Sequence, residues 1–126
     1  MTEQIPLAGV VLDAPDPREL ASFYQQLLGW KVDHGDDNWV SMKGPDGSSK
    51  LSIQREPNHQ PPSWPSKTDR QQMQVHLDFQ VTDLESAQQR AVEAGATLMD
   101  WQPQKEGVRV LADPVGHIFC LFLPGF

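Results

Sequence analysis

Side chains that could do chemistry gather at two places in the second half of the sequence. His76 and Asp78 stand two residues apart in HLDFQVT, and Cys120, the single cysteine, lies in IFCLFL. Residues two apart in a strand point to the same face, so the imidazole and the carboxylate could act as a general acid and base. They could equally form a hydrogen-bonded polar pair that bridges strands. Cys120 is also open to two interpretations, a small buried apolar residue or a reactive nucleophile.

The first half of the chain predicts a strand followed by a helix. Residues 9–14 (GVVLDA) predict the strand. Asp16, Pro17 and Glu19 predict the helix start, because an aspartate cap, a proline at the first helical position and a glutamate three residues after the cap are typical of one. Gly29 predicts the helix end. Apolar residues recur at helical spacing between these signals, at Leu20, Phe23, Tyr24, Leu27 and Leu28.

The same pattern recurs in the second half. Residues 76–82 predict a strand, Asp83 a helix cap and Gly95 the helix end. Each capping aspartate follows the equivalent strand position, Gly9 or His76, by seven residues. Short strands are predicted after the two helices at 30–32, 39–42 and 51–54, and at 97–101, 108–111 and 118–123. The chain is therefore predicted to be a tandem duplication of a βαβββ unit, with α+β architecture.

A proline-rich stretch separates the two halves. We predict one domain over residues 1–126, with module one at about 5–55, a connector at 56–72 and module two at about 73–126. Prolines at 57, 61, 62 and 65 predict an irregular connector, because proline neither continues a helix nor pairs within a central strand. Trp64, in its centre, could pin the connector to a module or close one end of a pocket.

Composition excludes several classes of partner. The net charge is −7 and the ten Lys and Arg residues are scattered, so phosphate-rich partners such as nucleic acids are disfavoured. No apolar run approaches the roughly 20 residues that cross a bilayer, so no membrane partner is expected. A lone cysteine and no visible export signal favour a cytoplasmic location.

The paired units resemble the vicinal oxygen chelate superfamily, which includes glyoxalase I, bleomycin-resistance proteins, fosfomycin-resistance enzymes and extradiol dioxygenases. The resemblance rests on DPRELASFYQQLLGW (16–30), HLDFQVTDLESA (76–87) and DPVGHIFCL (113–121). PPSWP (61–65) followed by QQMQVHLDF is similar to a glyoxalase-like group of small bacterial proteins. The resemblance implies an eight-stranded mixed sheet curled around a cavity, with the helices outside, and a homodimer.

In metal-dependent members of the superfamily, four inward side chains bind a divalent ion. The matching positions here are Gly9, Leu51 (or Ser52, with one residue of slippage), His76 and Cys120, of which only His76 is a typical ligand. The resemblance therefore implies an incomplete metal site, and we predict no cofactor. A partner chain that donates a missing ligand would keep a divalent metal possible.

Strand alternation predicts which residues face the cavity. On residues 76–82 the polar set is His76, Asp78 and Gln80, opposite an apolar set that would pack under the helices. A mixed polar and aromatic wall suits a planar or partly hydrophobic organic ligand with hydroxyl or amine groups, and phosphate fits poorly. The further predicted ligand-binding residues are Val11, Asp13, Trp39, Gln54, Trp64, Trp101, Ile118, Cys120 and Phe122.

Three functions compete at this point. The first is a binding protein that encloses a drug or metabolite without a complete metal site. The second is an enzyme of the same fold, either a metal-dependent lyase, isomerase or dioxygenase-like enzyme, or a metal-free acid–base catalyst using His76 and Asp78. The third is a regulatory or interaction module with a vestigial pocket.

Overall fold

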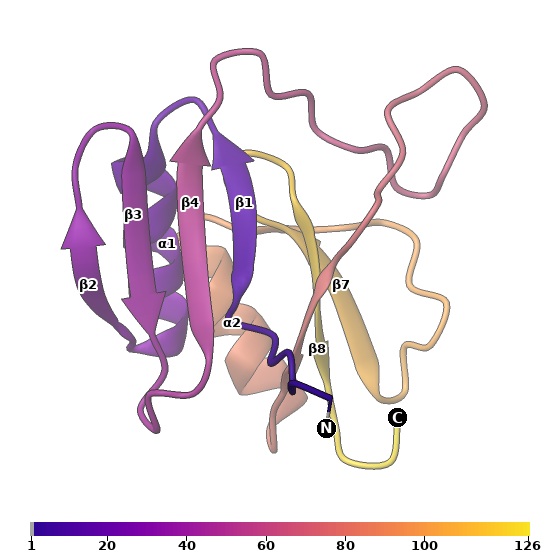
Figure 1. The fold of residues 1–126 in the computed structure, drawn as a ribbon. Helices are drawn as coiled ribbons and strands as arrows, with labels where there is room; N and C mark the ends of the chain where they lie inside the picture. Colours follow the sequence, from indigo (N-terminus) through magenta and orange to yellow (C-terminus); the bar gives the residue numbers. More distant parts are fainter. Residues whose placement is uncertain (1) are drawn as a thin grey trace. The chain divides into compact units, whose positions relative to one another are not determined.

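The computed structural model describes residues 2–126, and the chain divides between His59 and Gln60 into two compact units, unit one and unit two. Each unit contains one four-stranded mixed sheet and one helix (Figure 1). The predicted α+β fold of paired βαβββ modules, with eight strands in total, is confirmed, and the strands form two four-stranded sheets. None of the helices within residues 2–126 combines the length and apolar character needed to cross a bilayer.

Unit one follows the predicted order of elements. Its sheet has the order β1-β4-β3-β2, in which β1 runs parallel to β4 and the other pairs are antiparallel. The Asp16 carboxylate accepts hydrogen bonds from the backbone N–H groups of Arg18 (3.1 Å) and Glu19 (3.4 Å), and Gly29 ends the helix with a φ of 72°. The elements are β1 (Val10–Ala14), α1 (Pro17–Leu28), β2 (Lys31–Gly35), β3 (Trp39–Lys43) and β4 (Lys50–Arg55).

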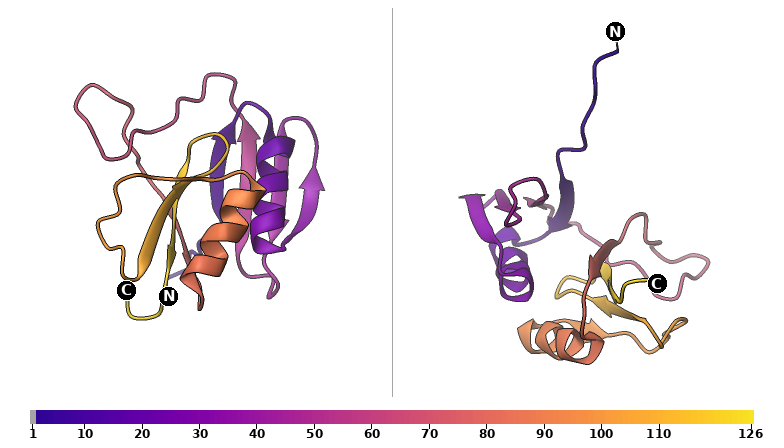
Figure 2. Two further views of the ribbon diagram at one scale, coloured as in Figure 1. Left: turned by 180° about the vertical axis from the view of Figure 1, so that it is seen from behind. Right: turned by 90° about the horizontal axis from the view of Figure 1, so that it is seen from below.

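The core of unit one lies between α1 and one face of its sheet, as the view from behind in Figure 2 shows. The apolar stripe predicted for α1 is buried at Leu20, Phe23, Tyr24 and Leu27. Strand residues at alternate positions supply the facing side, because the register places them on the same face. They are Leu12, Ala14, Val40, Met42, Leu51 and Ile53.

Unit two repeats this topology, with the sheet order β5-β8-β7-β6 and β5 parallel to β8. The Asp83 carboxylate accepts the backbone N–H of Ser86 (3.0 Å) and so caps α2, as predicted. The elements are β5 (Leu77–Gln80), α2 (Leu84–Ala94), β6 (Thr97–Leu98), β7 (Val108–Ala112) and β8 (Ile118–Phe122). Strand β5 is shorter than predicted, so His76 lies directly before it.

Two strands end three residues away from their predicted ends. Strand β6 ends at Leu98 and not at residue 101, because the Val110 N–H of β7 donates to the Gln102 side-chain carbonyl (2.8 Å) and not to a backbone carbonyl. The Val110 carbonyl accepts both the Met99 backbone N–H (3.1 Å) and the Gln102 side-chain amide (2.9 Å). Strand β2 continues to Gly35, beyond the predicted end at residue 32, because a bulge between Val32 and His34 lets its pairing with β3 resume.

The connector contains neither helix nor strand, as predicted, and its second part packs on unit two. The Trp64 indole N–H donates to the Trp101 carbonyl (3.0 Å), and the two ring centroids lie 5.1 Å apart. Pro61 lies so close to Gly116 that a Cβ at residue 116 would be 2.3 Å from the Pro61 Cβ. These contacts agree with the interpretation of Trp64 as a pin.

Candidate functional site

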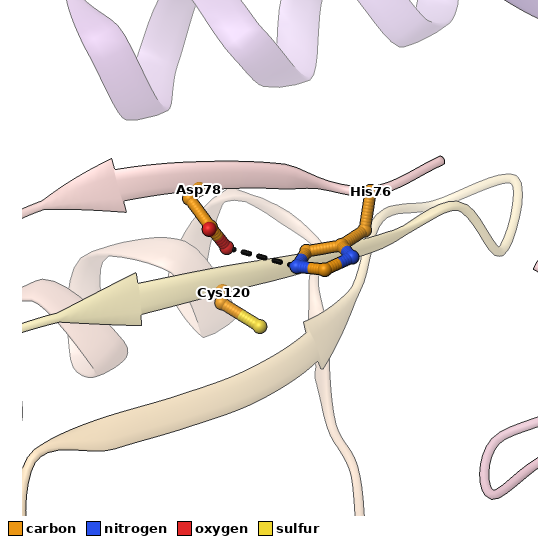
Figure 3. A group of neighbouring side chains, drawn as sticks. All are labelled: His76, Asp78 and Cys120. Atoms are coloured by element: carbon orange, nitrogen blue, oxygen red, sulfur yellow. Dashed lines mark ion pairs between the residues drawn. The ribbon is translucent and has the colours of Figure 1, made fainter. Parts of the chain in front are cut away.

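Three side chains of unit two form a compact cluster, the His–Asp–Cys cluster of His76, Asp78 and Cys120. Asp78 on β5 and Cys120 on β8 are register partners, and His76 precedes β5 by one residue. One donor atom from each residue lies within 4.8 Å of the other two (Figure 3). The His76 Nε2 is 3.0 Å from the Asp78 Oδ1. The spacing of two residues therefore brings the imidazole and the carboxylate together.

The environment of Cys120 keeps its thiol neutral. Burial, followed by the negative charge of Asp78 and a hydrogen bond from the thiol to its carboxylate, raises the pKa of Cys120 to about 11. The thiolate is the nucleophilic form of cysteine, and little of it exists near neutral pH at such a pKa. Cys120 in this state is a half-buried, weakly polar wall and a poor nucleophile.

A hollow of about 190 Å³, the unit-two hollow, opens beside the cluster. One part of its wall is polar and the rest is apolar. Alternation along the last strand predicted Cys120 and Phe122 at this wall, and alternation along residues 76–82 predicted His76 and Asp78. The full lining is His76, Asp78, Gln104, Val108, Cys120, Phe122 and Phe126.

Three lining residues escaped the sequence analysis. Val108 is the register partner of Phe122, so alternation along β7 could have identified it. Gln104 and Phe126 lie in irregular segments, where no periodic pattern exists. The Phe126 ring rests on Gly107, where an added Cβ would lie 2.3 Å from the nearest ring atom. The glycine therefore allows the ring to reach the hollow.

A larger depression of about 860 Å³ follows α2 and the segment between β6 and β7. Its lining is largely amide and charged side chains and includes neither histidine nor cysteine. Because the smaller hollow gathers the perturbed thiol and the imidazole–carboxylate pair, it is the better candidate for a functional site.

The remaining predicted ligand residues lie elsewhere. In unit one, register places Asp13, Gln54 and Trp39 in one row across three strands, and the Gln54 amide donates to the Asp13 carboxylate at 2.6 Å. Val11 points to the same face and is 45% exposed. A role for these residues beside a ligand stays a prediction.

In unit two, three predicted ligand residues are not among those lining the hollow: Trp64, Trp101 and Ile118. The two tryptophans pack on each other, and Ile118 is buried, with 3% of its surface exposed. The structure therefore places them in packing contacts of unit two, and any contact with a ligand remains a prediction.

Residues 9–122 match the protein family described as a glyoxalase-like domain. The chain belongs to the glyoxalase-like family. The match covers both modules, and with the solved structures it confirms the predicted membership of the vicinal oxygen chelate superfamily. No curated protein sequence matches the chain.

Solved structures share the fold over nearly the whole chain. The genomically encoded fosfomycin resistance protein FosX from Listeria monocytogenes has a TM-score of 0.72 at 15% identity, covering 98% of this chain and 97% of its own. A possible glyoxalase from Bacillus cereus has a TM-score of 0.69 at 16% identity, covering 94% and 99%. An antibiotic binding protein from a Streptomyces species has a TM-score of 0.64 at 14% identity, covering 99% and 100%. At such identities the likeness shows a common fold.

Register decides which residue of unit one matches Cys120. Cys120 pairs with Asp78 in unit two, and the equivalent pair in unit one is Ser52 with Val11. Leu51 instead pairs with Val10 and is buried in the core. The count from Gly116 to Cys120, applied from Gly47 in unit one, gives Leu51. Unit one has one more residue between its turn glycine and the matching strand position, so the count stops one residue short of Ser52. Ser52 is therefore the counterpart, and the alternative at Leu51 is wrong.

The four-ligand metal site of metal-dependent relatives does not fit these residues. A Cβ at Gly9 would lie 2.7 Å from the Lys50 carbonyl oxygen and 3.0 Å from the Lys50 Cβ, so a ligand side chain there would require the backbone to move. Ser52 offers a hydroxyl, which is not among the usual zinc ligands. Unit one thus supplies no typical ligand at either position.

Proposed function

We propose that the unit-two hollow binds a small organic molecule, with an amine or hydroxyl group beside Asp78 and an apolar ring against Phe122. The observation that carries this proposal is the meeting of the His76–Asp78 pair, at 3.0 Å, with the apolar residues Val108, Phe122 and Phe126 in one hollow. Such a combination of apolar surface and a few convergent polar groups is typical of small-molecule sites.

Charge supports an amine or a hydroxyl over an acid. The lining contains Asp78 but no lysine or arginine, and the whole chain has a net charge of −7. A carboxylate or phosphate ligand would face the Asp78 carboxylate without a permanent cation to balance it. An ammonium or hydroxyl group would instead donate a hydrogen bond to that carboxylate.

The size of the hollow limits what it can hold. Its volume of about 190 Å³ is below the roughly 300–1,000 Å³ of sites that enclose drug-sized ligands. It therefore suits a single substituted ring or the end of a longer molecule. Fosfomycin resistance and antibiotic binding among solved relatives with this fold support an organic ligand of natural-product type.

Fragment binding tests the proposal. We expect benzylamine and phenol to shift NMR signals of residues 76–80, 104–108 and 118–126, and the anionic benzoate to leave them unchanged. Asp78→Asn should weaken benzylamine binding, and Phe122→Ala should weaken both fragments. Glu93→Gln, which alters the larger depression, is the matched control. Equal binding of benzoate and benzylamine, or loss of binding in the control, would contradict the proposal.

Acid–base catalysis at the same site is a second candidate function. It is favoured by the 3.0 Å contact between the His76 Nε2 and the Asp78 Oδ1 at the edge of the hollow, where a bound molecule could exchange a proton with the imidazole. Incubating the chain in D₂O with a ring compound that has an acidic carbon-bound hydrogen, such as phenylacetone, and following deuterium incorporation at that carbon by mass spectrometry tests it, because hydrogens on nitrogen and oxygen exchange without a catalyst. Exchange that disappears in His76→Gln would support catalysis, and exchange unaffected by that substitution would exclude the dyad.

We also propose that the chain acts as a homodimer in the cytoplasm of a bacterial cell. The bacterial sources of the solved relatives and the lone, half-buried cysteine support the setting. The dimer rests on resemblance and on exposed apolar residues near the start of the chain. Light scattering on the purified protein measures its state directly.

A further inference from the structure

We propose that the connector loop of residues 60–71 binds hydrogen phosphate, with Ser63, Lys67 and Arg70 as donors and Asp69 as acceptor. The loop belongs to unit two and borders a hollow of about 480 Å³, the connector hollow. This hollow shares no residue with the unit-two hollow, so the site is separate from the one proposed for an organic ligand. Its lining is Gln60, Pro61, Ser63, Lys67, Asp69, Arg70 and Gln71.

Hydrogen bonds hold the connector loop in place although it contains neither helix nor strand. The Ser63 backbone N–H donates to the Gln71 carbonyl (2.9 Å), so the segment turns back on itself (Figure 1). The Trp64 indole N–H donates to the Trp101 carbonyl (3.0 Å) and fixes the start of the loop on unit two. The side chains between Ser63 and Gln71 are therefore gathered around one hollow.

The hydroxyl of Ser63 points to a ligand in this hollow. Its Oγ is buried and has no hydrogen-bond partner within residues 2–126. Buried hydroxyl groups are generally hydrogen-bonded, because a desolvated donor without an acceptor costs free energy. Ser63 lines the connector hollow, so an anion bound there would offer an oxygen atom to the Ser63 O–H.

The charges around the hollow favour an anion. Lys67 and Arg70 both line it, and neither forms an ion pair within the part of the chain that the structure describes. Their side chains are donors only, and a guanidinium group can hold two oxygen atoms of a phosphate at once. Two cations against the single carboxylate of Asp69 make this hollow locally positive, although the whole chain has a net charge of −7.

Asp69 selects among oxyanions. Its carboxylate repels a fully ionised anion but accepts a hydrogen bond from a P–OH group. Hydrogen phosphate keeps such a group at pH 8, whereas sulfate has none and a phosphate monoester, with a second pKa of about 6, has lost it. Asp69 has a φ of 65°, which aspartate and asparagine tolerate better than most residues. Asp69→Asn can therefore remove the charge while the backbone is retained.

Calorimetric titration of the full chain at pH 8 and low salt tests the site. We expect one equivalent of inorganic phosphate to bind, and sulfate and methyl phosphate to bind at least about tenfold more weakly. Ser63→Ala and Arg70→Gln should each weaken phosphate binding at least about tenfold, the usual loss when a hydrogen bond to a charged group is removed. Asp69→Asn should abolish the preference for phosphate over sulfate, because the amide can donate to a fully ionised oxyanion.

Lys31→Gln is the matched control, because it removes one positive charge from an exposed position of unit one. It should bind phosphate as the unmodified chain does. Circular dichroism shows whether each variant is folded, and NMR shifts of residues 60–71 on phosphate addition give a second readout.

Three results would overturn the phosphate site. They are a folded, unmodified chain in which phosphate produces neither heat nor NMR shifts, equal binding of phosphate and sulfate, and equal losses in Lys31→Gln and Arg70→Gln. Benzylamine should bind Ser63→Ala and Arg70→Gln as it binds the unmodified chain, because the two hollows share no residue. Failure of the phosphate site is thus distinguishable from failure of the proposed function.

Discussion

At the scale of single residues, the pKa of Cys120 follows from its burial on β8 and from the nearby carboxylate of Asp78. Burial is the larger cause of its raised pKa and the Asp78 charge is the second. A cysteine in this setting is protected from alkylation and oxidation, because both reactions use the thiolate.

The first prediction concerns the reactivity of this thiol. With a pKa of about 11, alkylation of Cys120 by iodoacetamide should be slow at pH 8 and should rise about tenfold per pH unit until it levels near pH 11. Asp78→Asn removes the second cause and should speed the reaction, while burial keeps the pKa above that of the unfolded chain. Mass spectrometry at several pH values measures the rate, with urea-unfolded protein as reference. A plateau below pH 9 in the folded chain would contradict this prediction.

At the scale of elements, each helix starts at an aspartate that could be recognised in the sequence. Asp16 accepts two backbone N–H groups and Asp83 accepts one. Replacing either by alanine leaves those donors without their partner. We therefore expect Asp16→Ala and Asp83→Ala each to lower the free energy of unfolding by about 0.5–2 kcal/mol, measured by urea denaturation.

Asp37→Ala provides the control for the caps. Asp37 pairs with Arg18 at 3.1 Å, but the two side chains are 92% and 58% exposed, so the pair is screened by solvent. Its loss should change the free energy of unfolding by less than about 0.5 kcal/mol. A larger effect of Asp37→Ala than of Asp16→Ala would show that surface charge, and not capping, governs the start of α1.

A second element-scale prediction concerns the wall of the unit-two hollow. In Gly107→Ala the new methyl group would meet the Phe126 ring at 2.3 Å, so the ring must leave. Because Phe126 is 53% exposed, little stability should be lost, but benzylamine binding should weaken as much as in Phe126→Ala. Gly35→Ala is the control, since its nearest contact would be an ordinary 3.5 Å. Unchanged binding in Gly107→Ala would exclude Phe126 from the site.

Sequence reasoning succeeded where a feature is local or periodic. Capping aspartates and terminal glycines set both helices, and alternation placed Asp78 and Cys120 on one face. It failed where a distant contact decides the structure. The Gln102 side-chain carbonyl accepts the Val110 N–H of β7 where a β6 carbonyl would otherwise do so, and no pattern in the sequence predicts this contact.

The candidate site shows the same division. Counting from the turn glycines left Leu51 and Ser52 as alternative counterparts of Cys120, and the strand register selects Ser52. Gln104 and Phe126 reach the hollow from irregular segments, whose course depends on contacts such as the one between Phe126 and Gly107. These positions depend on three-dimensional packing, which a single sequence does not encode as a pattern.

At the scale of the whole molecule, the segment before β1 carries unusual apolar exposure. Ile5 is 90% exposed and Leu7 is 85% exposed, and the segment extends away from β1 (Figure 2, right). Two large aliphatic side chains in water are unfavourable, and burial of each against another surface would contribute about 1.5–3 kcal/mol. A second copy of the chain can provide that surface without any other component.

We therefore predict that the chain self-associates through this segment. The double variant Ile5→Ser, Leu7→Ser should raise the dimer dissociation constant by at least about 100-fold, because roughly 3–6 kcal/mol of apolar burial is lost and each 1.4 kcal/mol corresponds to tenfold. Multi-angle light scattering across a dilution series measures this change. Val92→Ser, at a residue of α2 that is 45% exposed, is the control and should leave association unchanged. An unmodified chain that is monomeric throughout, or a double variant as dimeric as its parent, would show that the segment has no such role.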